Sequence, residues 1–167
     1  MTFADFCTWL ETLPLAEYIG GTAWFPFLES IHVLAAVFVF GSILMVDLRL
    51  LNVAARAYSL TRMSQELVPW TWGAFVVAVV TGIGLFMPRA GGYAENAAMQ
   101  IKFVLLALAG ANMALFHFAV YRHIPAAEIS TDEISTDSTG VAKLAGAASL
   151  LIWSGVLLAG RWVGHLI

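Results

Sequence analysis

The stretch Trp24-Phe25-Pro26-Phe27-Leu28-Glu29-Ser30-Ile31-His32-Val33 begins an apolar run that continues to Val46. As a helix, a run of this length crosses about 30 Å of hydrocarbon. Glu29 and His32 are the two ionisable residues inside the run, and at a spacing of three they share one face of the helix. Because an unpartnered ionisable group is costly in hydrocarbon, the pair is a candidate functional site.

The composition of the whole chain is that of an integral membrane protein. Of its 167 residues, 60% are hydrophobic and 11% are charged, with a mean hydropathy of +0.84. The apolar segments do not alternate in the way that strands of a transmembrane barrel do. We therefore expect an all-α fold, a four-helix transmembrane bundle forming a single membrane domain. Its spans are expected at about residues 24–46, 70–87, 101–121 and 141–163.

The first residues predict a short helix on the membrane surface. Thr2 and Asp5 have the spacing of a capping box, and apolar residues follow at helical intervals. The segment carries no Lys or Arg, so it lacks the basic region of a secretory signal. We expect an amphipathic interfacial helix at about residues 2–13, ending near Pro14.

Basic residues are unevenly divided between the two sides of this predicted bundle. The loops after the first and third spans and their borders carry Arg49, Arg56, Arg62, Arg122 and Lys143. The other side carries Arg89, Lys102 and Arg161. The positive-inside rule places the basic loops in the cytoplasm and both termini outside.

Two connections between the spans carry local signals. The third contains Glu-Ile-Ser-Thr-Asp twice, at residues 128–132 and 133–137. Such a polar repeat has too little apolar content to pack, so we expect a mobile cytoplasmic loop at about residues 125–139. The short second connection contains Gly91-Gly92, which is a turn signal.

The helical rise places polar residues of different spans at common depths. Near the outer surface, Glu29 and His32 share a level with Lys102, at the start of the third span, and with Arg161, at the end of the fourth. One interpretation is structural: Glu29 pairs with Arg161 or Lys102 and locks the bundle, with His32 hydrogen-bonded beside it. The other is that the cluster moves protons, because intramembrane carboxylates and histidines are the usual parts of proton relays.

Both histidines inside the spans share their level with glycines of the other helices. Gly82 or Gly84, Gly110 and Gly155 lie near the depth of His32, and Gly41, Gly73 and Gly146 near that of His117. Small residues allow close packing of helices in membranes. Alternatively, they make room for a flat macrocycle with the histidine as an axial ligand, which a b-type haem needs without any Cys-x-x-Cys-His motif.

In the haem hypothesis His32 and His117 are the iron ligands, and Lys102, Arg161 or Arg122 pairs with the propionates. The two histidines cannot easily ligate one iron within a chain, because roughly nine residues of helix, or about 14 Å, separate their depths. A second ligand would come from His165 or His123, both expected near the headgroups, or from a homodimer. Otherwise each iron has one protein histidine, or no haem is bound.

A second hypothesis is a copper or other metal-ion site at the outer face, formed by Glu29, His32 and His165. Imidazole suits both copper and zinc. Glu-x-x-His is also the spacing of di-iron helices, but no other span supplies the inward carboxylates that such bundles need.

Asp47 and Arg49 lie at the inner end of the first span. Residues two apart do not face each other on a helix, so each needs a different partner. We expect Arg122 or Lys143 to pair with Asp47.

Short motifs cover nearly the whole chain. They are Trp24-Phe25-Pro26, Glu29-x-x-His32, Gly41-Ser42, Asp47-Leu48-Arg49-Leu50-Leu51, Pro69-Trp70-Thr71-Trp72, Thr81-Gly82, Lys102, Phe116-His117, Tyr121-Arg122 and Gly160-Arg161-Trp162. In these the chain resembles a family of bacterial four-helix membrane proteins known mainly as a domain of unknown function. The resemblance implies four spans and a bacterial inner membrane, and it brings no established activity.

Three functions remain open from the sequence. The first is a membrane redox protein that binds haem b between its helices, and the second is metal-ion handling through Glu29 and His32. The third is a non-catalytic partner subunit or a proton-coupled transporter. The lipid bilayer is the expected partner, with a homodimer or a larger membrane complex as alternatives. A net charge of −3 offers no surface for nucleic acid, and no hydrolase or phosphate-binding motif is present.

Overall fold

The computed structural model describes residues 2–54, 60–119 and 140–165 of the chain. Within these ranges no strand occurs, and four long helices dominate. They are α3 (Trp24–Leu50), α4 (Leu60–Phe86), α6 (Ala97–Ala119) and α8 (Gly140–Val163). Each contains a segment long and apolar enough to cross a membrane. The predicted all-α fold with four spans is confirmed, and the chain is a multi-pass membrane protein.

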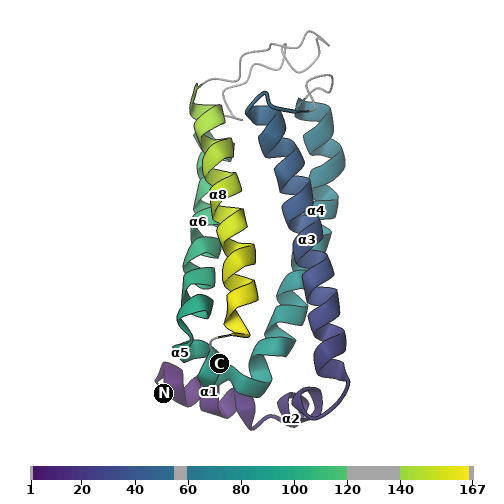
Figure 1. The fold of residues 1–167 in the computed structure, drawn as a ribbon, viewed down its shortest axis with the longest axis vertical. Coiled ribbons are helices and arrows are strands. Elements are labelled where there is room, and N and C mark those ends of the chain that lie inside the picture. The colour runs from purple at the N-terminus through teal and green to yellow at the C-terminus, as the bar shows by residue number, and fades with distance from the viewer. Residues whose placement is uncertain (1, 55–59, 120–139, 166–167) are drawn as a thin grey trace.

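The four long helices form two antiparallel hairpins. α3 packs along α4 and α6 along α8, and the hairpins meet chiefly through α3 and α8. Both termini lie at one end of the bundle, which we call the terminal end (Figure 1). The opposite end, where α3 ends and α4 begins, is the loop end. Three short helices cover the terminal end: α1 (Phe3–Glu11), α2 (Pro14–Gly20) and α5 (Ala90–Glu95).

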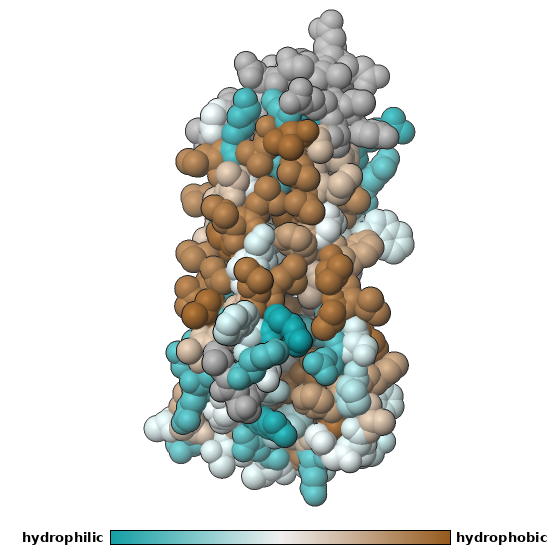
Figure 2. All heavy atoms as spheres, viewed as in Figure 1, coloured by the Kyte–Doolittle hydropathy of each residue, from teal (hydrophilic) through white to brown (hydrophobic). Residues whose placement is uncertain are grey.

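The outer surface of the bundle is apolar and its interior is built from small residues. Leu34, Leu144 and Leu151 are more than 70% exposed. Figure 2 shows hydrophobic residues covering the middle of one face, with hydrophilic residues gathered toward its ends. Buried small side chains include Ala35, Ser42, Ala109, Ser149 and Ala159. Small residues between helices and large apolar ones outside are the pattern of helices packed in lipid.

Polar side chains cross-link each hairpin internally. The hydroxyls of Ser42 in α3 and Thr71 in α4 lie 2.8 Å apart. In the other hairpin, Asn112 Nδ2 of α6 donates to the Ala145 carbonyl of α8 at 3.2 Å. Such bonds satisfy polar groups that hydrocarbon cannot.

The expected capping box is present at the start of α1. Asp5 N donates to Thr2 Oγ1 at 3.2 Å, and Thr2 N donates to Asp5 Oδ2 at 2.7 Å. These hydrogen bonds lower the pKa of the Asp5 carboxyl from its usual value. The helix ends at Glu11 rather than near Pro14, because Pro14 occupies the first turn of α2, where its missing N–H costs nothing.

The second connection is helical where a turn was expected. Met87–Arg89 form a 3-10 helix, η1, and Gly91-Gly92 lie inside α5, so the turn prediction was wrong. Gly91 N donates to Glu11 Oε1 of α1 at 2.8 Å, which ties α1 to α5. The predicted mobile loop at residues 125–139 lies outside the described residues.

At the loop end, α3 ends in a Schellman motif. Asn52 has a φ of 57°, the left-handed conformation that this motif requires at its C′ position. Val53 N donates to the Leu48 carbonyl at 3.0 Å, and Asn52 N donates to the Arg49 carbonyl at 3.1 Å. Arg49 Nη1 also donates to Asn52 Oδ1 at 3.0 Å.

We expect the backbone of Asn52 to govern which substitutions this position accepts. Asn52→Val forces a β-branched residue into left-handed space and should cost about 1–2 kcal/mol of stability. Asn52→Gly, which loses the same side-chain bond to Arg49, should lie closer to wild type. Thermal unfolding in detergent tests this, and equal losses for the two variants would contradict it.

Candidate functional site

His32 lies against α4 through one edge of its ring. Nδ1 is 2.8 Å from the Ala78 carbonyl oxygen and 3.2 Å from Thr81 Oγ1. A carbonyl can only accept, so Nδ1 carries the hydrogen and donates it. The hydroxyl of Thr81 donates to the Val77 carbonyl at 2.7 Å, which leaves its oxygen free to accept from His32 as well.

These bonds fix the tautomer of the neutral imidazole. With the hydrogen on Nδ1, Nε2 holds the lone pair. No hydrogen bond joins Nε2 to any side chain or backbone group in the part of the chain that the structure describes. His32 therefore offers one nitrogen for a ligand or a proton.

Gly82 provides the space in which the imidazole lies. A Cβ at Gly82 would come within 3.1 Å of His32 Cε1 and 3.4 Å of Nδ1. The expected pairing of His32 with Gly82 is thus present, and the ring itself occupies this space. At Gly155, likewise, a Cβ would lie 2.9 Å from Leu105 Cδ1, whereas nothing lies within 4 Å at Gly110.

In the other hairpin, the side chain of Lys102 likewise lies beside a glycine of the paired helix. Its side chain, half-buried on α6, runs beside Gly160 of α8, where a Cβ would lie 3.5 Å from Nζ. The charge of Lys102 acts electrostatically on His32, so the two side chains lie near each other although they belong to different hairpins. We call His32, Thr81, Gly82, Lys102 and Gly160 the His32–Lys102 site.

The ion pair expected at Glu29 is not formed. Among the described residues the one ion pair within 4.0 Å joins Arg62 and Glu66, so Glu29 contacts neither Lys102 nor Arg161 in this way. Three residues turn a helix by about 300°. With His32 directed at α4, Glu29 is left exposed, in a surface groove that Ser30 also lines.

A cluster of aromatic side chains at the terminal end includes the residue that follows Lys102 in the sequence. Phe103 follows Lys102 on α6 and meets Phe86 of α4 edge to face, with ring centroids 6.3 Å apart. Phe86 also stacks on Tyr93 of α5 at 6.0 Å. The Phe86–Tyr93 stack depends on the α5 helix, which the sequence did not predict.

The remaining predicted site residues are dispersed. His117 lies in α6 fifteen residues beyond Lys102, which is about 22 Å along the helix, and its side chain is outside the described part. His165 is exposed near Trp162, with ring centroids 6.5 Å apart. Arg161 is also exposed. The described residues contain no group of three His, Cys, Asp or Glu side chains placed to hold a metal ion.

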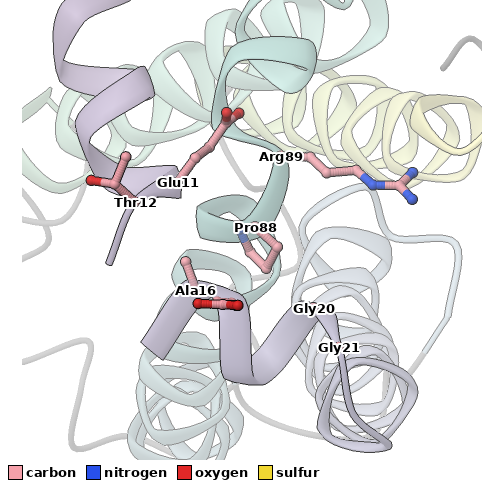
Figure 3. A pocket seen from close by; sticks show the side chains of 8 residues that line it. Glu11, Thr12, Ala16, Gly20, Gly21, Pro88 and Arg89 are labelled. Carbon is pink, nitrogen blue, oxygen red and sulfur yellow. The ribbon is translucent and has the colours of Figure 1, made fainter. Parts of the chain in front are cut away.

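A second hollow lies at the terminal end, between α1, α2 and η1. It has a volume of about 390 Å³ and is lined by Glu11, Glu17 and Arg89, among others. Figure 3 shows the Arg89 side chain extending away from it and Glu11 turned toward the α5 side. Glu11 is already bonded to Gly91, so this hollow offers no convergent set of chemical groups.

Comparison with known proteins gives one match. The model of the family of unknown function DUF6644 matches residues 6–166. No curated protein and no solved structure matches the chain.

We expect Gly82 to be required by the imidazole next to it. Gly82→Leu should lower stability by about 1–3 kcal/mol, because the side chain overlaps the ring of His32. Gly73→Leu, also on α4, is the matched control: nothing lies within 4 Å of its Cβ position, and leucine is the better helix former. Thermal unfolding of both variants in detergent is the measurement, and similar losses at the two positions would contradict the assignment.

Proposed function

The chain belongs to the family of unknown function DUF6644, and we propose from the chemistry of the His32–Lys102 site that it is a membrane protein binding b-type haem for electron transfer. The haem would supply an iron that accepts and releases single electrons. The proposal includes a bacterial inner membrane with both termini in the periplasm. The basic residues near the loop end support this orientation.

One observation carries the proposal: His32 Nδ1 donates to the Ala78 carbonyl at 2.8 Å. Histidines that ligate metals usually donate their second ring N–H to a carbonyl or carboxylate, which fixes the ring and its tautomer. His32 has this support within the membrane-spanning part of the chain, and Nε2 is left with its lone pair for iron.

Lys102 and the aromatic cluster suit the propionates and the apolar ring of a haem. An ammonium without an ion-pair partner among the described residues can neutralise a propionate. Phe86, Phe103 and Tyr93 supply apolar ring surface near the same end of the bundle. Lys102 and His32 belong to different hairpins, so the group would lie between them.

His32 would be the one iron ligand at this depth of the bundle. By helical rise, His117 lies about 14 Å in depth from His32, too far to ligate the same iron. The proposal therefore specifies an iron ligated by one histidine of one chain, or by one histidine from each of two chains. Absorption spectra separate these two cases through the spin state of the iron.

Proton transfer is the second candidate, and the state of Lys102 favours it. Lys102 forms no ion pair among the described residues, and its charge acts on an imidazole that has one open nitrogen. Such intramembrane groups are the usual parts of proton relays. This function needs no haem, and it would stand if the spectra below show none.

The haem proposal predicts that His32 is required for a Soret band. After expression with adequate haem, the purified wild type should show the band, and His32→Ala should lose it. His165→Ala, an exposed histidine near the same end, should keep it and serves as the matched control. A wild type without the band, or a His32→Ala variant that keeps it with unchanged intensity, would overturn the proposal.

Lys102 is expected to contribute to retention of the haem through its charge. Lys102→Met should raise the haem dissociation rate by about ten- to a hundredfold, since a charge-assisted hydrogen bond is worth roughly 1.5–3 kcal/mol. Lys102→Arg keeps the charge and should lie nearer to wild type. Transfer of haem to an apoglobin acceptor measures the rate, and equal rates for all three proteins would remove Lys102 from the site.

A further inference from the structure

Asp47 is a buried carboxyl at the loop end, far from the His32–Lys102 site. It lies on α3 fifteen residues after His32, which is about 22 Å along the helix. The residue is 5% exposed, and it lies where α3 meets α8. Its expected partners were Arg122, which is outside the described residues, and Lys143.

The hydrogen bonds of this carboxyl are incomplete. Ser149 of α8 hydrogen-bonds to the side chain. The second oxygen, Oδ2, is fully enclosed and has no hydrogen-bond partner in the described part of the chain. No ion pair within 4.0 Å joins Asp47 to Lys143, so that pairing was wrong.

The charged groups on the neighbouring elements are directed elsewhere. Arg49, on α3 itself, donates to Asn52. On α4, Arg62 pairs with Glu66, and both side chains are exposed. On α8, Lys143 lies six residues before Ser149 and has other interactions. The described part of α6 brings no charged side chain to this level.

The helices approach closely at this point. A Cβ at Gly146 of α8 would lie 3.4 Å from the Asp47 carbonyl oxygen and 3.3 Å from Leu50 Cβ. Water therefore has little room between the helices beside the carboxyl. A carboxylate with one unpaired oxygen is unfavourable in such surroundings, whereas a neutral acid is far less so.

We propose that Asp47 is a proton-binding site, occupied in the packed bundle, whose deprotonation loosens the contact between α3 and α8. A serine hydroxyl can accept from a carboxylic acid as readily as it donates to a carboxylate, so the Ser149 contact survives protonation. Oδ2 is then the carbonyl oxygen of a neutral group. Loss of the proton leaves a buried negative charge, which brings water into the contact or separates α3 from α8.

Infrared spectroscopy of the full-length protein tests the protonation directly. At neutral pH the wild type should show the carbonyl stretch of a protonated carboxyl, above the amide I band, because exposed carboxyls are ionised there. Asp47→Asn should lack this band, while Glu66→Gln, which changes an exposed carboxyl, should keep it. Absence of the band from the wild type at neutral pH would overturn the proposal.

Thermal unfolding tests the consequence for the α3–α8 contact. An unfolded aspartate ionises near pH 3.9, so above that pH a proton held by the folded state is lost on unfolding, and stability falls as pH rises. The unfolding temperature of Asp47→Asn should therefore fall less than that of wild type between acidic and alkaline pH. At alkaline pH it should equal or exceed that of wild type. A variant less stable than wild type at alkaline pH would mean that the charge has a stabilising partner, and would overturn the proposal.

Discussion

Hydrocarbon offers no hydrogen bonds, and the structure depends on that constraint. Every backbone amide in the spans must be satisfied inside its own helix, so the chain has four long helices. Each polar side chain at membrane depth must likewise find a partner inside the bundle. Ser42 hydrogen-bonds to Thr71, Asn112 to the Ala145 carbonyl, and His32 to the Ala78 carbonyl. Among the described residues, one oxygen of Asp47 is enclosed without a hydrogen-bond partner and Lys102 forms no ion pair, and the functional arguments rest on these two groups together with His32.

The number of spans was predictable because it depends on length and hydropathy alone. The short elements at the terminal end were not, since α2, η1 and α5 are too short to show a period and one of them contains two glycines. The capping box at Thr2 and Asp5 was predictable because its two hydrogen bonds are local. The other elements at the terminal end depend on contacts between residues far apart in the chain, which cannot be read from a single sequence.

The candidate site shows where depth arithmetic succeeds and where it fails. Helical rise gives the level of a residue along the membrane normal, and it brought His32 to the level of Gly82 correctly. It says nothing of how each helix is turned about its axis. His32 and Glu29 differ by about 60° around α3, and that difference separates a half-buried imidazole from an exposed carboxylate. The ion pair at Glu29 was wrong for this reason.

At two glycines, the neighbouring group is an ionisable side chain rather than an apolar residue packed between helices. A glycine inside a helix costs about 1 kcal/mol relative to alanine, and a close contact at its Cβ position can offset that cost. At Gly155 that contact is Leu105, an ordinary apolar neighbour, and at Gly73 none lies within 4 Å. At Gly82 and Gly160 the contacts are His32 and Lys102, one in each hairpin. An apolar neighbour would pack equally well at those two positions, so an imidazole and an ammonium there indicate chemistry that packing alone does not require.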